Sequence, residues 1–249
     1  MQPIGRFLDG GVRHPHVHLC FDDRSVSNWH GARGILARHR AKAVFYVDGF
    51  HLLSSEEIGM LDDLRADGHV VGCHGKAHRD AVAYSRRYGI DRYIDDEIVP
   101  AMEEMIGAGF DPTHFAFPFT RFDDALFAEM ERIFCFVRSG NAGTMWSGGR
   151  AIPLQGRADV GRIPIESAIR AGDLADAVET IRSGVEEGVS PVIIFHDVRP
   201  ADAPAHAGTH ARGYITPDEL NTVLSAITHS GYSYETFRDR CEIPPDAED

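Results

Sequence analysis

The sequence predicts a single α/β domain built on a closed or nearly closed barrel of parallel strands. Short apolar runs alternate with amphipathic segments along the chain, a pattern typical of parallel strands joined by helical crossovers. The chain of 249 residues is long enough for one barrel-sized domain. No internal repeat, low-complexity tract or linker-like run divides it. We therefore predict one domain over residues 1–249, with its core at about 15–238.

Each predicted element follows from a local pattern. The apolar strand candidates are, in chain order, VHLCF, AVFYV, HVVGCH, FAFPF, IFCFVR, GRIPIE, PVIIF and, after the last helix, YSYETF. Capping boxes predict two helix starts, Ser54 with Glu57 and Thr216 with Glu219. Amphipathic patterns predict further helices over Trp29–His39, Asp91–Ala108 (bent at Pro100) and Asp173–Glu187.

Composition narrows the function. Hydrophobic residues make up 43% of the chain, so a substantial core can form, and no apolar run is long enough to cross a bilayer. The net charge of −13 argues against nucleic acid or an anionic membrane surface as the main partner. The amino-terminal segment lacks the pattern of a secretory signal. The four cysteines form no CxxC pair, which predicts reduced thiols in a cytoplasmic protein.

Polar side chains follow three of the predicted strands. Asp22 and Asp23 end the first run, His74 ends the third, and His196 ends PVIIF. In parallel barrels the carboxyl ends of the strands form the reactive face, so these groups should meet at one rim. His78 comes four residues after His74, a spacing that places both imidazoles on one side of a helical turn. Two imidazoles and a carboxylate suit a borderline divalent metal, zinc first and cobalt, manganese, iron or nickel as alternatives.

Each motif alone has an ordinary structural explanation. HGKAH could be a solvated helix face, the two aspartates a helix cap, and His196 a hydrogen-bonded core residue. The H-x-H of His16 and His18 matches the metal signature of amidohydrolase barrels. These histidines lie at the start of the first strand, however, where barrel residues serve stability. The metal hypothesis therefore depends on the polar groups converging at the strand ends.

Together the motifs resemble a known family. FDD, GHVVGCHGKAH, FAFPF and PVIIFHDV, in this order over about 17–237, are similar to motifs of the NodB-homology polysaccharide deacetylases (carbohydrate esterase family 4). The resemblance implies a deformed (β/α)7 barrel. It also implies that Asp23, His74 and His78 bind the metal. The remaining roles that it implies are a general base at Asp22, a general acid at His196 and an oxyanion-binding backbone N–H at Phe119.

The chain departs from the family pattern in three places, so it resembles an atypical member. Ala116 stands where the third motif normally carries an arginine that orients the base. We expect Arg121, in preference to Arg162, to supply that charge. Trp146 in GTMWSGG is the candidate for the fourth motif, and Arg24 follows the two aspartates where glycine is usual. Arg24, Arg121, Trp146 and Arg162 are our candidates for substrate binding.

The sequence thus predicts a metal-dependent hydrolase that removes an N-acetyl group from a sugar or glycan, acting on a linear amide. Two alternatives remain: a cytoplasmic hydrolase of a small cyclic amide (allantoinase-like or a cyclic-imide hydrolase), and a non-catalytic carbohydrate-binding protein. The irregular segment Asp197–Tyr214 carries Arg199, His206, His210 and Arg212 and is expected to form a lid over the rim. Its cations and Arg24 favour an acidic or nucleotide-linked sugar.

Overall fold

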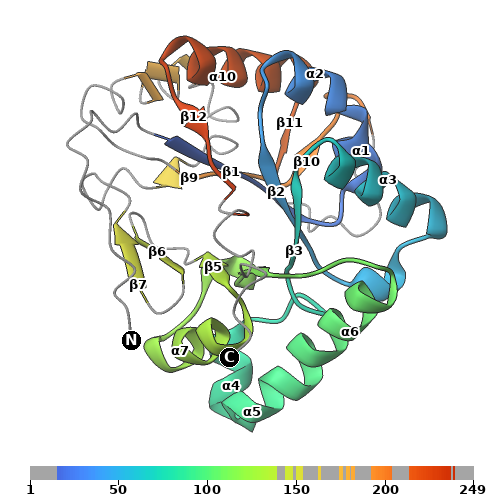
Figure 1. Ribbon diagram of the computed structural model, residues 1–249, viewed down its shortest axis with the longest axis vertical. Helices are drawn as coiled ribbons and strands as arrows, with labels where there is room; N and C mark the ends of the chain where they lie inside the picture. The colour runs from blue at the N-terminus through green and yellow to red at the C-terminus, as the bar shows by residue number, and fades with distance from the viewer. Residues whose placement is uncertain are drawn as a thin grey trace, which may run out of the picture.

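The computed structural model describes residues 16–138, 144–147, 150–153, 162–163, 174–175, 178–179, 181–182, 192–203, 213–236 and 238. Its centre is a curled parallel sheet (Figure 1). The parallel strands follow the spatial order β5-β4-β3-β2-β1-β9-β8. Their bounds are β1 His16–Asp23, β2 Ala43–Val47, β3 Val70–Cys73, β4 His114–Ala116, β5 Phe136–Arg138, β8 Arg162–Ile163 and β9 Val192–Phe195. This is the predicted deformed (β/α)7 barrel.

Shorter strands extend this sheet and flank it. β6 (Thr144–Ser147) and β7 (Arg150–Pro153) add an antiparallel hairpin beyond β5. β12 (Ser233–Tyr234) pairs with the first residues of β1. β10 (Asp197–Val198) and β11 (Tyr214–Ile215) pair in parallel and hold together the two ends of the segment predicted as a lid. Residues 204–212 of that segment, with His206, His210 and Arg212, lie outside the described part.

Helices lie above, to the right of and below the sheet in Figure 1. They are α1 Val26–Gly31, α2 Arg33–Arg38, the 3₁₀ turn η1 Phe50–Leu52, α3 Ser55–Ala66, α4 Ala81–Tyr88, α5 Ile90–Tyr93, the π-helical turn η2 Ile94–Ile98, α6 Val99–Gly107, the 3₁₀ turn η3 Pro118–Thr120, α7 Asp124–Ile133 and α10 Pro217–His229. Both predicted capping boxes are present, at Ser54 with Glu57 and at Thr216 with Glu219.

The long helix predicted over Asp91–Ala108 is divided. α5, η2 and α6 follow one another without a break, and the π-helical turn ends just before Pro100. Proline has no N–H to donate to the preceding turn. A π turn changes the hydrogen-bond spacing there and commonly lies near a functional site. The irregularity predicted at Pro100 is therefore a widened turn on its amino-terminal side.

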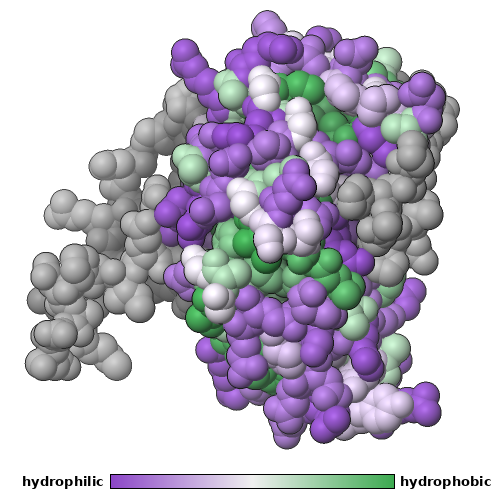
Figure 2. All heavy atoms as spheres, turned by 90° about the vertical axis from the view of Figure 1, so that its right-hand side faces the viewer, coloured by the Kyte–Doolittle hydropathy of each residue, from purple (hydrophilic) through white to green (hydrophobic). Residues whose placement is uncertain are grey.

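The core has two layers, as expected for strands whose side chains alternate between faces. Between sheet and helices, Phe21 stacks on Phe45 with ring centroids 4.9 Å apart, and Trp29 packs 5.3 Å from Phe45. Inside the curl lies a second buried cluster that includes Cys20 and Tyr46. Viewed from the side of α3 and α6, apolar surface is broken into patches among polar side chains (Figure 2). Within the described residues, no helix combines the length and apolarity needed to span a membrane.

The cysteines correct one prediction. Cys20 and Cys73 are free and buried, as expected for reduced thiols. Cys135, directly before β5, is disulfide-bonded. The prediction that every cysteine is a reduced thiol is therefore wrong at Cys135, because spacing along the chain does not reveal cysteines that the fold brings together.

The H-x-H stretch lies at the amino end of the barrel, as predicted. His18 Nδ1 donates to the Glu235 carbonyl at 2.9 Å, and His114 Nε2 donates to the Thr236 carbonyl at 2.8 Å. Burial lowers the pKa of His18 to about 3 and that of His114 to about 4, more than these hydrogen bonds raise them. These neutral histidines fasten the carboxy-terminal segment to the barrel floor.

Candidate active site

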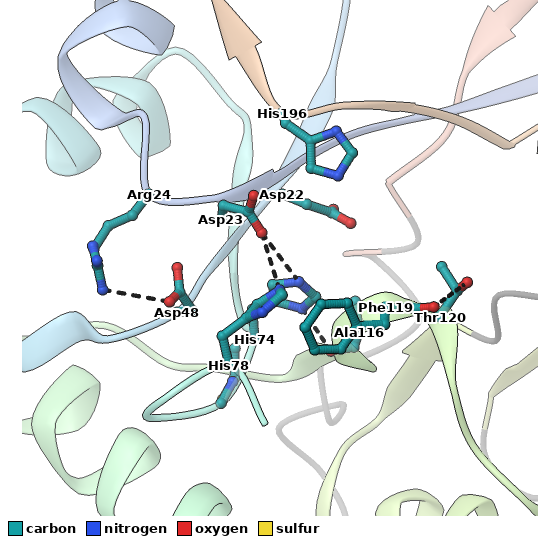
Figure 3. Close-up of polar contacts among 12 residues, drawn as sticks. Asp22, Asp23, Arg24, Asp48, His74, His78, Ala116, Phe119, Thr120 and His196 are labelled. Atoms are coloured by element: carbon teal, nitrogen blue, oxygen red, sulfur yellow. Dashed lines mark hydrogen bonds and ion pairs between the residues drawn. The ribbon is translucent and has the colours of Figure 1, made fainter. Parts of the chain in front are cut away.

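The predicted metal ligands converge at the carboxyl end of the sheet (Figure 3). Asp23 ends β1, His74 directly follows β3, and His78 lies in the next loop. His78 Nε2 lies 3.1 Å from Asp23 Oδ1, and His74 Nε2 lies 3.8 Å from the same oxygen. One ligand atom from each residue falls within 4.8 Å of the other two, and all three side chains are buried. Within the described residues, this is the one cluster of metal-binding type.

The backbone between the two histidines differs from the prediction. Residues 74–80 form a loop, so the expected helical turn is wrong. Gly75 has φ +86° and His78 has φ +52°, conformations that break a right-handed helix. These two left-handed residues bring the imidazole centroids to 5.0 Å. The two imidazoles do converge, as the four-residue spacing predicted, but through a loop and not through a helical turn.

The donor set fits a divalent cation. His74 Nδ1 donates to the Ala116 carbonyl at 2.7 Å, which fixes the tautomer and leaves Nε2 as the ligand atom. Burial lowers the pKa of His74 to about 4, so its imidazole is neutral at neutral pH. Burial raises the pKa of Asp23, but the hydrogen bond with His78 and the nearby imidazoles lower it to about 2. Neutral imidazole and ionised carboxylate are the forms that bind metal.

The predicted base has a cationic partner that sequence reasoning missed. Arg138, at the end of β5, places Nη2 2.5 Å from Asp22 Oδ2, and both side chains are almost fully buried. Its guanidinium also lies over the ring of Tyr46, 4.9 Å from the centroid. Burial lowers the pKa of Arg138, but the Asp22 charge raises it further, well above its ordinary value. Arg138 thus carries a fixed charge against Asp22.

Arg121 does not compensate Asp22, and that prediction is wrong. Its side chain is 69% exposed and pairs with Asp80, Nη1 to Oδ2 2.7 Å. Arg138 on β5 pairs in register with Ala116 on β4. The positive charge that the family pattern places at position 116 therefore lies on the neighbouring strand in this chain. In the sequence, the one visible indication of this role is that an arginine ends the apolar run IFCFVR. Strand pairing had to be known before that signal could be interpreted.

His196 directly follows β9, and its ring lies beside Asp22 and Asp23 (Figure 3). It is half-buried. Trp29 Nε1 donates to the His196 backbone carbonyl at 2.7 Å, and Asn28 donates to Asp197 Oδ1 at 2.7 Å. Helix α1, which begins just after the aspartates, therefore fixes the backbone that carries His196.

Phe119 stands at the open side of the cluster. Its ring contacts His78 edge-on with centroids 4.5 Å apart, and 37% of its surface is exposed. Phe119 and Thr120 both have left-handed backbone, φ +58° and +56°. Such strain persists only where surrounding structure enforces it, and it gathers at functional sites. The turn places Phe119 at the rim as predicted; its role in binding an oxyanion stays a prediction.

Arg24 is less available to a substrate than its position predicts. Its Nη1 lies 3.4 Å from Asp48 Oδ2, and the side chain is 16% exposed. The guanidinium packs against Gly49 (φ +54°), where a Cβ would come within 2.1 Å of Nη1. The predictions on Trp146 and Arg162 concern side chains outside the described part; their backbones lie in β6 and β8.

Comparisons with known proteins concern the family and the fold of the chain. The family model described as polysaccharide deacetylase matches residues 9–133. The comparison with curated proteins found no match. Among solved structures, the chitin deacetylase from Colletotrichum lindemuthianum has a TM-score of 0.61 and 17% identity, with 94% of this chain and 91% of that chain covered.

Two bacterial structures are similar over comparable lengths. The polysaccharide deacetylase Bc1974 from Bacillus cereus has a TM-score of 0.60 and 16% identity, with 92% and 95% covered. The peptidoglycan deacetylase PdaC from Bacillus subtilis has a TM-score of 0.57 and 14% identity, with 92% of each chain covered. These likenesses show the shared barrel fold, and the family match covers half of the sequence. The chain belongs to the polysaccharide deacetylase family, a family of hydrolases.

Proposed function

We propose that the chain hydrolyses the N-acetyl group of a sugar or glycan with the help of a divalent metal, zinc being the first candidate, held by Asp23, His74 and His78. The observation that carries this proposal is the buried three-residue cluster directly beside the Asp22–Arg138 pair. Arg138 also removes the reason for considering a non-catalytic protein, which was the alanine at position 116.

The residues divide the reaction among them. A bound divalent ion would lower the pKa of a water and polarise the acetyl carbonyl. Asp22 Oδ2 is engaged by Arg138, whereas Oδ1 is buried and makes no hydrogen bond within the described part of the chain. We assign Oδ1 as the oxygen that takes the proton of the attacking water. The Phe119 N–H donates to the developing oxyanion, and His196 protonates the departing amine.

The substrate class is proposed from the relatives and from the rim. Two similar structures are named as peptidoglycan and chitin deacetylases, so we propose a glycan that contains N-acetylated sugars. An acidic or nucleotide-linked sugar stays a prediction, since Arg24 already pairs with Asp48. The cytoplasmic location also stays a prediction, and the disulfide at Cys135 favours an oxidising compartment instead.

Acetate release tests the proposal. The protein is freed of metal, loaded with zinc or cobalt, and given N-acetylglucosamine oligomers, acetate esters and cyclic ureides in parallel. We expect metal-dependent acetate release from the N-acetylated oligomers. Ring opening of a ureide without acetate release would contradict the proposal and favour the cyclic-amide alternative.

A further inference from the structure

Glu97 is a buried carboxylate outside the catalytic set. It lies on the π-helical turn η2, and the residue has 0% exposure. Its Oε2 accepts a hydrogen bond from Ala77 N–H at 2.9 Å, and its Oε1 pairs with Arg79 Nε at 2.8 Å. Its backbone carbonyl accepts from Lys76 N–H at 3.0 Å. Every one of these partners belongs to the loop that carries His78.

These contacts lie on both sides of His78, the proposed metal ligand. Ala77 and Arg79 are the residues directly before and after His78, so one carboxylate fixes the chain on both sides of it. His78 itself has the left-handed φ of +52°, a strained conformation for a non-glycine residue. Ala77 and Arg79 therefore resist relaxation of His78 toward an ordinary conformation, in which its ring would turn away from Asp23.

Two further features bring Glu97 into place. Glu97 lies within the π turn, whose hydrogen bonds span five residues and so direct its side chains differently from those of a regular α-helix. Gly75, with φ +86°, lies against the carboxylate, and a Cβ there would be 3.3 Å from Glu97 Oε2. The loop therefore approaches Glu97 closely at a position that favours glycine.

We propose that Glu97 is a positioning residue for the metal site: it holds the Gly75–Arg79 loop so that His78 faces Asp23. This inference rests on the proposed metal-binding function of Asp23, His74 and His78. Hydrogen-bonding partners that orient metal ligands commonly contribute 10–100-fold to affinity. The backbone bond to Ala77 is the main contact for loop geometry, because it holds the main chain directly beside His78, whereas Arg79 contacts Glu97 through a side chain that is 47% exposed.

Zinc titration of the metal-free protein, followed calorimetrically, tests the proposal. Glu97→Ala should weaken zinc binding about 10–100-fold, and saturating zinc should restore most of kcat because the reacting groups are untouched. Glu97→Gln keeps an oxygen acceptor for Ala77 N–H and should stay within about threefold of the original affinity.

Glu219→Ala is the matched control for stability. Its carboxylate also accepts a backbone N–H, that of Thr216 at 2.8 Å, in the capping box of α10. This variant should lose stability in urea without any change in zinc affinity. If Glu97→Ala does not fold, Glu97→Gln and Glu97→Asp carry the test: the shorter Asp should weaken zinc binding and Gln should not.

The outcomes separate the two proposals. Zinc affinity unchanged in Glu97→Ala, or weakened equally in Glu97→Gln and Glu97→Ala, would overturn the positioning role, since the second result would mean that charge alone matters. Absence of zinc binding in the unaltered protein would instead overturn the proposed function itself.

Discussion

The two ends of the barrel both bury histidines, and the difference between them shows what makes a histidine functional. At the amino end, His18 and His114 donate to the backbone carbonyls of Glu235 and Thr236. At the carboxyl end, His74 also donates to a carbonyl through Nδ1, but its Nε2 faces the Asp23 carboxylate. The same residue type holds a distant backbone segment at one end and is the proposed metal ligand at the other.

Strained backbone conformations are also distributed unequally between the two ends of the barrel. Within the described residues, the non-glycine positions with positive φ are Asp23, Arg40, His78, Phe119 and Thr120. Asp23 and His78 belong to the proposed metal cluster, and Phe119 and Thr120 lie beside it. Strain of this kind is retained where a precise arrangement of side chains is needed. Four of these five strained positions therefore lie at the carboxyl end of the barrel, and Arg40, just before β2, lies at the amino end.

The largest effect should come from the base. Asp22→Asn removes the proton acceptor while leaving the ligand set intact. We expect kcat to fall roughly 10²–10⁴-fold with zinc affinity preserved, as measured by acetate release and calorimetry. Unchanged turnover would remove Asp22 from its role.

Arg138→Met should be next in size. It leaves the Asp22 charge buried without its partner, which costs about 3–5 kcal/mol of unfolding free energy. It also frees the carboxylate to turn, so kcat should fall by about 10–100-fold. Arg138→Lys should recover only part of this, because an ammonium lacks the guanidinium fork.

Combining Asp22→Asn with Arg138→Met sharpens this result. Both charges are then removed, so the double variant should be more stable in urea than Arg138→Met alone. Strictly additive stability losses would contradict a direct pair between the two side chains.

The buried histidine His18, at the amino end of the barrel, should make the stability of the protein depend on pH. The pKa of His18 is lowered to about 3 in the folded protein, against about 6.5 when unfolded. Between these values the unfolded chain binds more protons, so stability falls as pH decreases from about 6.5 toward 3. At pH 5 the loss through His18 is about 2 kcal/mol relative to pH 7.

His18→Gln keeps a side-chain donor but cannot titrate. The difference in unfolding free energy between pH 7 and pH 5, measured by urea denaturation, should shrink by about 2 kcal/mol in this variant. An unchanged difference would show that His18 is not held neutral by the fold.

Arg121→Ala should have the smallest effect. The Arg121–Asp80 pair is exposed, so its loss should change stability by less than about 1 kcal/mol. Because Arg121 does not touch Asp22, kcat should stay the same, in contrast to Arg138→Met. A fall in kcat comparable to that of Arg138→Met would restore the original assignment of Arg121.

Much of the fold, and the placement of the histidines at its two ends, could be predicted from the sequence. The barrel, both capping boxes and the convergence of Asp23, His74 and His78 followed from strand order and from motif resemblance. Strand ends are visible in a sequence because apolar runs stop there. His18 was also correctly placed away from the rim, since it precedes the first strand's carboxyl end.

The remaining features depend on contacts between distant segments. Arg138 reaches Asp22 only because β5 pairs beside Ala116, and no local pattern shows that pairing. The loop at His78 was predicted as a helical turn because a spacing of four residues does not report left-handed backbone. Glu97 and the disulfide at Cys135 were missed for the same reason: their partners are recognised only in the folded chain.

The most direct test of the central claim is zinc titration of two matched variants, His78→Ala and His18→Gln, beside the unaltered protein. Each replaces one buried histidine, at opposite ends of the same barrel. We expect His78→Ala to lose zinc binding while circular dichroism shows an intact fold, and His18→Gln to bind zinc with unaltered affinity. Full zinc binding by His78→Ala, or loss of binding in a folded His18→Gln, would contradict the central claim.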